Sequence, residues 1–405
     1  MNSILFVSYN GLLDPIGQSQ ILPYVRGLVG RGWRIAIVSF EKPEASAAAR
    51  DALAGELERL GVRWRALRYH ASRLALVQLY DVCAGVLAVT WLALVLRVGV
   101  LHARSTVAAA MTLPAVIGLR CRLLFDVRGL NAEEYVDGSG WSRRGLRFRI
   151  LHALEMSLLR RADAVVVLTE RVRALLECGG YGPALARRAM SVIPCCVDLD
   201  HFRYDPVAAA RVRSELGGDP LFVYLGSLGT WYLTDEMLAC FRAALRCWPA
   251  ARLLVLTPSS PSLVEAARER VGIPPDRVIV RRVEHRDVPA YLSAADVGLC
   301  FIQTSLAKQA SSPTKLAEYL ACGVPVLANG GVGDVEDVVD ADGVGAVVKE
   351  FSEAAYADAL ARIARLLEDR AKTRDACRRS AERRLALSMA VDRYEALYRL
   401  VSGRP

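Results

Sequence analysis

The sequence predicts an α/β protein with two doubly wound, Rossmann-like domains. Short apolar runs alternate with helical patterns from end to end, which is typical of βαβ units with buried parallel strands. The chain has 405 residues, and two domains are expected because one core rarely grows beyond about 250–300 residues. The predicted strands are Ile4–Val7, Ile35–Val38, Leu123–Asp126, Ala164–Leu168, Leu221–Leu225, Leu253–Leu256, Val278–Val280, Val297–Cys300 and Val326–Ala328.

A polar, proline-containing stretch near the middle marks the expected domain boundary. Ile193–Phe202 end one strand, and the next apolar run opens only at Leu221. We therefore expect an N-terminal domain over 1–200 and a C-terminal domain over 201–387. Residues 388–405 predict an amphipathic helix, with apolar positions at Val391, Tyr394, Leu397 and Tyr398.

The clearest binding pattern is a predicted helix start at Ser312. Serine is a good N-cap, and Pro313 fits the first helical position, where its missing N–H costs nothing. The free amides of Thr314, Lys315 and Leu316 would then point out of the helix N-terminus, beside the positive end of the dipole. This arrangement predicts a site for an anion such as a phosphate group.

Two charged residues strengthen that prediction. Lys315 puts a positive charge in the first turn, where the helix dipole favours an acid. Glu318 lies one turn further on the same face and suits hydrogen bonds from sugar hydroxyls. An ordinary capped helix ending at Gly323 would explain Ser312 and Gly323 alone. Lys315 and Glu318 together favour a site for a phosphate and a ribose.

The loop after the first strand is a second candidate phosphate site. In Gly11–Gln20, a glycine such as Gly17 lets backbone amides approach a phosphate closely. Gly11 and Gly17 do not form a G-x-G-x-x-G fingerprint, which argues against NAD or FAD. The alternative is a simple strand–helix turn.

Asp126 and Arg128 follow a buried strand, at the sheet edge where α/β proteins place their sites. Arg128 suits a phosphate or acceptor hydroxyls, and Asp126 suits the orientation of an acceptor. A structural ion pair between the two is equally compatible with the sequence. His102 and Arg104, at another strand end, leave the same two interpretations open.

The helix start resembles the donor-nucleotide motif of the retaining glycosyltransferases of family 4. Glu318 stands at the second Glu of that motif, Ala321–Val326 match its Ala-Cys-Gly-x-Pro-Val tail, and Ala310 stands at the first Glu position. The Ser-Pro-x-Lys variant ending at Lys315 resembles bacterial relatives that build surface polysaccharides. The resemblance implies the GT-B fold, in which two Rossmann-like domains face a central cleft. The acceptor is then expected mainly on the first domain and the nucleotide-sugar on the second. The resemblance also implies that the helix over 388–405 packs back on the first domain, which would suit Tyr394 and Tyr398.

The resemblance also implies which residues contact the donor. Gly226 and Ser227 are similar to the family's Gly-Arg start, with Ser in place of the Arg that usually holds the diphosphate. Gly17 would lie over the donor phosphates, and Val283 would face the base. The expected donor contacts are therefore Lys315, Glu318, Thr314, Leu316, Gly226, Ser227, Gly17 and Val283, with Lys308 in reserve.

The implied activity is retaining transfer of a sugar from a nucleotide-diphosphate-sugar to a hydroxyl acceptor, in surface polysaccharide or glycolipid assembly. Lys315, Arg128 and Asp126 are the expected catalytic residues. No cofactor is expected. No metal is expected either, because the D-x-D of Asp198 and Asp200 has no further oxygen ligands spaced around it. A sugar-nucleotide epimerase of the same fold and a non-catalytic nucleotide-sugar-binding protein remain as alternatives.

The positive charge is concentrated in the first half of the chain. Residues 1–200 carry 25 Lys and Arg and 17 Asp and Glu, and so hold +8 of the net +9. This excess suits an anionic membrane surface or an acidic acceptor, and a solvated arginine-rich surface is the alternative. Nucleic acid is not expected, because only 7% of residues are aromatic and no recognised motif is present.

Three further features bear on localisation. Ten cysteines without zinc spacing indicate a reducing cytoplasm, and the N-terminus runs straight into a strand rather than a signal peptide. Val82–Val100 are nearly all apolar and barely long enough to span a bilayer. We expect a buried core helix there, because a strand follows at once. The predicted location is cytoplasmic, with peripheral attachment to the inner membrane face and a lipid-linked acceptor among the candidates.

Overall fold

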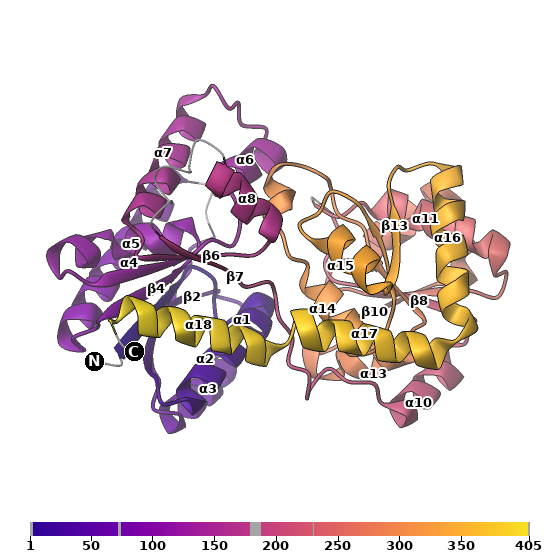
Figure 1. Cartoon of the computed structure of the whole chain (residues 1–405), viewed down its shortest axis with the longest axis horizontal. Helices are drawn as coiled ribbons and strands as arrows, with labels where there is room; N and C mark the ends of the chain where they lie inside the picture. The colour runs from indigo at the N-terminus through magenta and orange to yellow at the C-terminus, as the bar shows by residue number, and fades with distance from the viewer. Residues whose placement is uncertain (1–2, 72–73, 179–187, 230, 404–405) are drawn as a thin grey trace. The chain divides into compact units, whose positions relative to one another are not determined.

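The computed structural model describes residues 3–71, 74–178, 188–229 and 231–403 (Figure 1). The chain forms two compact units, Met1–Pro194 with Leu387–Pro405, and Cys195–Ala386. The division precedes the boundary predicted at residue 200, because Val197 and Phe202 belong to the second core. The Val197 amide donates to the carbonyl of Leu385 in that unit.

The first unit contains a parallel sheet of seven strands in the order β3-β2-β1-β4-β5-β6-β7. Its inner strands are rich in Val, Ile and Leu and are buried, as parallel strands covered on both faces require. The strands are β1 (Ser3–Ser8), β2 (Arg34–Glu41), β3 (Arg63–Arg68), β4 (Val100–Arg104), β5 (Arg122–Asp126), β6 (Ala164–Val167) and β7 (Ala189–Val192).

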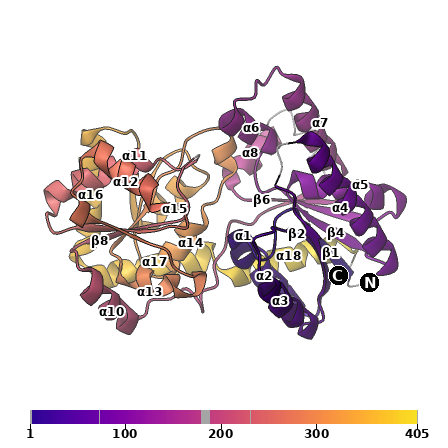
Figure 2. The same cartoon turned by 180° about the vertical axis from the view of Figure 1, so that it is seen from behind.

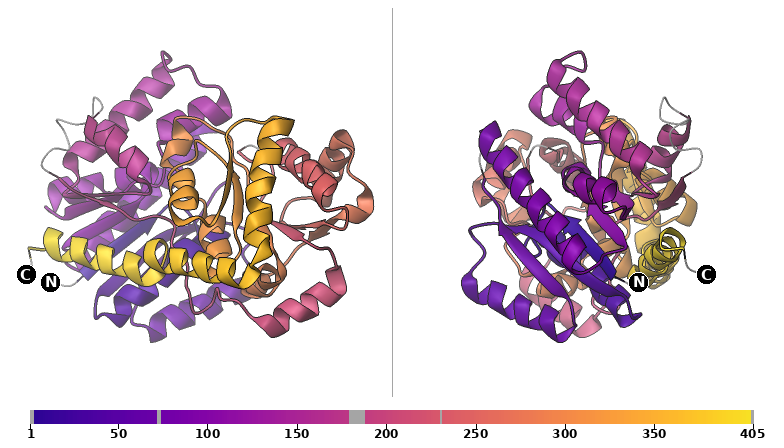
Figure 3. Two further views of the ribbon diagram at one scale, coloured as in Figure 1. Left: turned by 45° about the vertical axis from the view of Figure 1, so that its right-hand side comes forward. Right: turned by 90° about the vertical axis from the view of Figure 1, so that its left-hand side faces the viewer.

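Helices cover both faces of this sheet. Figures 1 and 2 show α4, α5 and α7 on one face and α2, α3 and α18 on the other, and the strands between them are visible in Figure 3. The helices are α1 (Pro15–Gln20), α2 (Leu22–Gly30), α3 (Ala47–Arg59), α4 (Ala75–Val95), α5 (Thr106–Gly118), α6 (Asn131–Ser139), α7 (Leu146–Arg161), α8 (Glu170–Cys178) and α18 (Leu387–Val401).

Helix α4 corrects the prediction of a buried core helix at Val82–Val100. One face packs inward at Val89 and Leu92, but the opposite face is exposed, and Leu87 is 71% exposed. Periodicity could not separate the two faces, because both are apolar. Among the described residues, one helix, Leu76–Val95, is long and apolar enough to cross a membrane, and 28% of this stretch is buried.

The second unit contains a parallel sheet of six strands in the order β10-β9-β8-β11-β12-β13. The strands are β8 (Leu221–Leu225), β9 (Arg252–Leu256), β10 (Val278–Arg281), β11 (Val297–Cys300), β12 (Val326–Asn329) and β13 (Gly345–Val348). The α-helices are α10 (Pro206–Leu216), α11 (Thr234–Cys247), α12 (Pro261–Val271), α13 (Val288–Ala294), α14 (Thr314–Ala321), α15 (Val335–Asp342), α16 (Glu353–Glu368) and α17 (Arg370–Arg384).

Two apolar layers stabilise the second unit, one on each face of its sheet. One layer joins Leu316 and Leu320 of α14 to Val223 of β8, and the other joins Phe241 of α11 to Phe222 of β8. Both sheets are parallel and wound by helices, so the predicted α/β class with two Rossmann-like units is confirmed.

Candidate functional site

The turn after β8 is the first part of the candidate donor site. Gly226 has a φ of +130°, which L side chains rarely adopt, and a Cβ there would lie 3.2 Å from Nζ of Lys315. The backbone therefore passes directly over the lysine amine. The Gly226 amide donates to the Leu256 carbonyl, and the Ser227 carbonyl accepts from the Tyr224 hydroxyl at 2.5 Å. The Gly226 amide is therefore already paired in this turn, and the contact of the Gly226–Ser227 backbone with a diphosphate stays a prediction.

Lys315 is the central residue of this site. Its side chain is nearly buried, with 6% exposed, and Nζ has no hydrogen-bond partner among the described residues. The amine lies 4.0 Å from the ring centre of Tyr224 and 4.2 Å from that of Tyr232. Burial lowers the pKa of Lys315 to about 8, against the opposing effects of Cys300 and Glu318. The lysine is still mostly charged at pH 7, so the site holds a buried cation that forms no direct ion pair among the described residues.

The start of α14 differs from the prediction. The helix begins at Thr314 with Pro313 as N-cap, and Ser312 does not cap it. The Ser312 hydroxyl instead accepts from the Cys195 amide at 3.1 Å. The Leu316 amide donates to the Pro313 carbonyl, so it is not free for an anion. Of the three predicted amides, those of Thr314 and Lys315 donate no hydrogen bond to other backbone groups in the described parts of the chain.

Glu318 lies one turn after Lys315 and is also almost buried. Oε1 of its carboxylate is 3.6 Å from Nε2 of His285, which the sequence did not place in the site. His285 stacks on His201, with ring centres 5.6 Å apart. Val283, predicted to face the base, is half-buried and packs against the same apolar layer as α14. The fold therefore brings Glu318 and His285 together, and Val283 packs on the apolar layer beneath them.

A second lysine of this unit also lies on an aromatic ring. Nζ of Lys308 is 3.8 Å from the ring centre of Trp231, and its side chain is buried. Trp231 and Tyr232 come from one segment between β8 and α11, so this segment supplies a ring to each lysine. The sequence suggested Lys308 as a reserve but gave no sign of its aromatic partner.

In the first unit, Gly17 is buried inside α1. A Cβ at Gly17 would lie 2.2 Å from the Gly11 carbonyl oxygen, so only glycine fits this turn. Glu41 holds the same turn, because its carboxylate accepts from the amides of Leu12 at 2.8 Å and Leu13 at 3.2 Å. Sequence reasoning missed Glu41, since it comes from β2 and meets the turn only in the folded sheet.

Asp126 and Arg128 form a buried network at the end of β5. The Arg128 guanidinium lies 3.5 Å from Asp126, and the Tyr394 hydroxyl of α18 donates to the same carboxylate at 2.9 Å. His102 Nε2 lies 3.4 Å from Asp126, and its Nδ1 lies 2.6 Å from the Tyr398 hydroxyl. Asp126 is 1% exposed, which corrects its predicted role of orienting an acceptor. The structure instead supports the alternative interpretation, a structural ion pair between Asp126 and Arg128.

The charges of this network follow from burial and proximity. Burial disfavours ionised Asp126, but Arg128, together with His102 and Arg104, holds its pKa well below the usual range. Burial lowers the pKa of His102 despite Asp126, so the imidazole is neutral at pH 7. Its Nε2 then donates to Asp126 while Nδ1 accepts from Tyr398, an assignment made from the hydrogen-bond network.

Glu155 is a buried acid that the sequence did not single out. It lies on α7 and accepts from the Thr106 hydroxyl at 3.1 Å. Burial raises its pKa to about 7, although Thr106 and the amides of Ala132 and Asn131 favour the charged form. A carboxyl that titrates near neutrality usually marks either a functional site or a strained core position.

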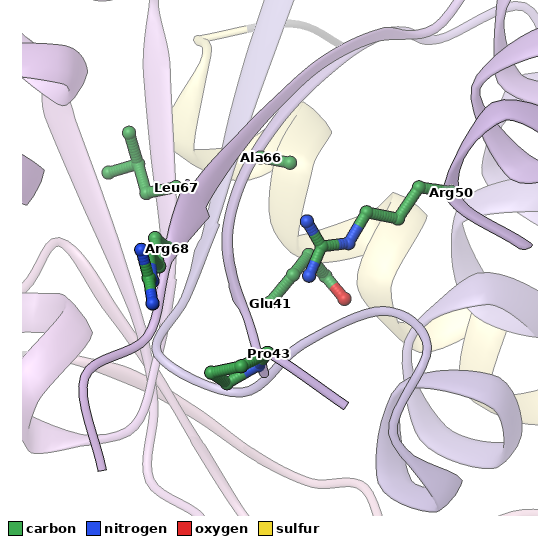
Figure 4. A pocket seen from close by; sticks show the side chains of 6 residues that line it. All are labelled: Glu41, Pro43, Arg50, Ala66, Leu67 and Arg68. Atoms are coloured by element: carbon green, nitrogen blue, oxygen red, sulfur yellow. The ribbon is translucent and has the colours of Figure 1, made fainter. Parts of the chain in front are cut away.

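A cavity of about 340 Å³ opens in the first unit beside β2 and β3 (Figure 4). Arg50 reaches in from α3, and Arg68 lies at the end of β3. Nε of Arg50 is buried without a partner among the described residues, while its terminal nitrogen donates to the Lys42 carbonyl. The buried carboxylate of Glu41 also lines the cavity.

The D-x-D pair is part of a turn. Oδ1 of Asp198 accepts from the amide of Asp200 at 2.9 Å and from that of His201 at 3.3 Å. Among the described residues, no group of three or more His, Cys, Asp or Glu side chains is arranged to hold a metal ion.

Two family descriptions match most of the chain. Residues 18–196 match the family described as Glycosyl transferase 4-like domain, and residues 219–367 match Glycosyl transferases group 1. The chain belongs to the family 4 type of glycosyltransferases with the GT-B fold. The predicted membership of the family 4 glycosyltransferases is thereby confirmed, and the roles of Lys315 and Glu318 stay predictions.

Solved structures show the same fold for this glycosyltransferase. A sucrose-phosphate synthase from Thermosynechococcus elongatus matches with a TM-score of 0.72 at 18% identity, covering 99% of each chain. HepE from Anabaena, solved in complex with UDP-glucose, matches with a TM-score of 0.67 at 17% identity, covering 98% of this chain and 99% of that one. Likenesses at these identities establish the fold alone.

One curated relative comes from Mycolicibacterium smegmatis. It is a GDP-mannose-dependent alpha-(1-6)-phosphatidylinositol monomannoside mannosyltransferase, 29% identical over 185 residues. The match covers 44% of this glycosyltransferase and 47% of the relative, so the two align over about half of the relative's length.

Proposed function

We propose that this glycosyltransferase moves a sugar from a nucleoside-diphosphate-sugar to a hydroxyl acceptor, with retention at the anomeric carbon. The observation that carries the proposal is the buried Lys315 amine, which has no hydrogen-bond partner among the described residues and lies under the Gly226 turn. A cation kept without an anion is costly, and a diphosphate supplies the missing charge.

Different residues of the second unit suit different parts of the donor. Lys315 and the open amides at the start of α14 suit the diphosphate, and Glu318 suits two neighbouring ribose hydroxyls. Mannosyl and glucosyl donors are the first candidates, because the curated relative is GDP-mannose-dependent and HepE was solved with UDP-glucose. Surface polysaccharide or glycolipid assembly is the proposed setting.

The reaction follows from the charge on the leaving group. The acceptor oxygen bonds to the anomeric carbon while the bond from that carbon to the diphosphate oxygen breaks. The acceptor proton passes to the departing phosphate on the same face, so the products are a glycoside and a nucleoside diphosphate. Lys315 stabilises the negative charge that grows on that phosphate, and its contribution is greatest in the transition state.

An acceptor with an anionic group suits the first unit. The cavity beside β2 and β3 carries the guanidinium groups of Arg50 and Arg68, which favour a phosphate or carboxylate. Phosphorylated or lipid-linked sugars therefore come first in an acceptor screen. The relative's acceptor, phosphatidylinositol monomannoside, has this chemistry.

The test is nucleotide release from GDP-mannose and UDP-glucose, with and without a panel of phosphorylated and lipid-linked acceptors. Release that depends on an acceptor, together with a product that keeps the donor's anomeric configuration by NMR, is the expected result. Donor isomerisation without an acceptor would identify an epimerase instead. Binding without turnover on any acceptor would identify a nucleotide-sugar-binding protein.

A further inference from the structure

The outer face of α4 is an unusual surface for a globular domain. Leu76, Tyr80, Leu87, Trp91 and Leu94 follow one another at helical spacing and point away from the sheet, and these five residues form the α4 patch. Leu76 is 80% exposed and Trp91 is 59% exposed. Between Leu76 and Val95 the single ionisable acid or base is Asp81, which lies on the inner face and is buried. Large contiguous apolar surfaces of this kind mark interaction sites.

The neighbouring helix extends this surface. Ile117, at the end of α5, is 61% exposed, and Leu119 follows it. Helices α4 and α5 each run back from the end of one parallel strand to the start of the next, so their C-terminal ends lie at the same edge of the sheet. They lie side by side on one face of that sheet in Figures 1 and 2.

Cations border the apolar surface. Arg97 follows the end of α4, Arg120 follows the end of α5, and both side chains are exposed without an acidic partner in the described parts of the chain. At the opposite end of this helix layer, α7 begins with Arg147 and Arg149 beside the exposed pair Leu146 and Ile150. This half of the chain also carries +8 of the net charge. Apolar and aromatic side chains next to unpaired arginines are complementary to an anionic lipid surface.

The packing of the inner face of α4 opposes a transmembrane arrangement of this helix. Asp81 accepts from the His70 amide at 3.0 Å and lies 2.6 Å from the His70 ring, which fixes the first turns of the helix. Gly85 is packed so closely against Met111 of α5 that a Cβ would lie 2.5 Å from its Sδ. Strands β3 and β4 of one sheet precede and follow α4, so a span would pull the sheet apart.

We propose that the α4 patch docks this protein on an anionic bilayer, with α4 lying flat in the lipid interface. The helix keeps its inner face on the sheet, its outer face enters the boundary between headgroups and acyl chains, and the neighbouring arginines contact lipid phosphates. This inference does not depend on the proposed function, because it uses no residue of the donor site.

The experiment is sedimentation of the purified full-length chain with large vesicles. Vesicles of equal parts phosphatidylglycerol and phosphatidylcholine should bind the protein at least about tenfold more tightly than phosphatidylcholine alone, and added salt should weaken that binding. Leu87→Glu with Trp91→Glu should reduce binding about tenfold or more without changing the circular dichroism spectrum, because both side chains are exposed. Leu263→Glu, on an exposed leucine of α12 in the second unit, is the matched control and should bind like the wild type.

A second readout locates the lipid contact. Brominated phosphatidylglycerol should quench part of the tryptophan fluorescence of the wild type, and Trp91→Phe should abolish that part. Equal binding by wild type and the Leu87→Glu, Trp91→Glu variant would overturn the proposal. So would a patch variant that changes only the oligomeric state, which would assign the surface to a second copy. Wild-type protein that leaves membranes only in detergent would show a span instead.

Discussion

Replacing Lys315 by Met should make the protein more stable and less active at the same time. Methionine keeps the length of the side chain and removes its charge. The pKa of Lys315 falls from 10.5 to about 8 on burial, which corresponds to about 3 kcal/mol of unfavourable free energy for the charged form. Cation–π attraction to the rings of Tyr224 and Tyr232 offsets about 1–2 kcal/mol of this unfavourable free energy. Desolvation therefore outweighs the rings, and Lys315→Met should gain about 1–2 kcal/mol at pH 7.

The sign of this effect depends on pH. Because the folded-state pKa is depressed, the lysine is charged in both states below about pH 8, and the penalty is fully present there. Between about pH 8 and the unfolded-state pKa the penalty disappears, so the wild type gains stability relative to Lys315→Met as the pH rises. Urea unfolding of both proteins at pH 7 and at pH 10 measures the difference.

Activity should change in the opposite direction. Removing one preorganised cation from a developing negative charge costs about 10²–10³ in rate, so kcat should fall by that factor with a smaller change in donor KM. Lys349→Met, at an exposed lysine of the second unit, is the matched control and should change neither property. A Lys315→Met protein less stable than the wild type, or one with unchanged kcat, would refute the view that this amine is held ready for a diphosphate.

Four further outcomes test other parts of the structure. Glu318→Ala should weaken donor binding by about 1.5–3 kcal/mol in calorimetry, and an unchanged Kd would remove the carboxylate from the ribose site. Gly226→Ala should destabilise the second unit by about 1–3 kcal/mol, because φ is +130° there; a neutral thermal shift would contradict this. Wild-type stability should fall by up to about 3 kcal/mol from pH 4.5 to about pH 7, since Glu155 is protonated more readily in the folded state, and Glu155→Gln should remove that slope. Tyr394→Phe should cost about 1–3 kcal/mol by leaving buried Asp126 short of a donor, whereas unfolding like the wild type would make that contact dispensable.

The inner strands of both sheets could be predicted because buried parallel strands are continuous apolar runs, as at Leu253–Leu256. The edge strand β3 was missed because Arg63–Arg68 alternate charged and apolar residues and are largely exposed. Helix α4 was only half predicted. Its exposed face is as apolar as its buried one, so no hydrophobic periodicity distinguished the surface from the core.

Within the candidate site, the sequence could predict the features that depend only on residues close together in the chain. Lys315 and Glu318 stand out because they lie one turn apart at a helix start. The aromatic rings around Lys315 could not be predicted, since Tyr224 and Tyr232 lie far away along the chain and reach α14 only through the packing of β8 beside β11. The return of α18 to the first unit was implied by the family resemblance, but the hydrogen bond from Tyr394 to buried Asp126 could not be predicted from the sequence.

That last helix has a consequence for how the protein is made. Tyr394 and Tyr398 of α18 complete the buried network around Asp126 and His102, although β5 and β4 are synthesised early. On the ribosome, the second unit therefore emerges before the first can finish folding, and the part of the first sheet that α18 covers is completed only after Leu387–Val401 have left the exit tunnel. The order of synthesis thus opposes the usual folding of domains one after another from the N-terminus. Truncation before Tyr394 would therefore damage the first unit, although most of that unit lies far from this position in sequence.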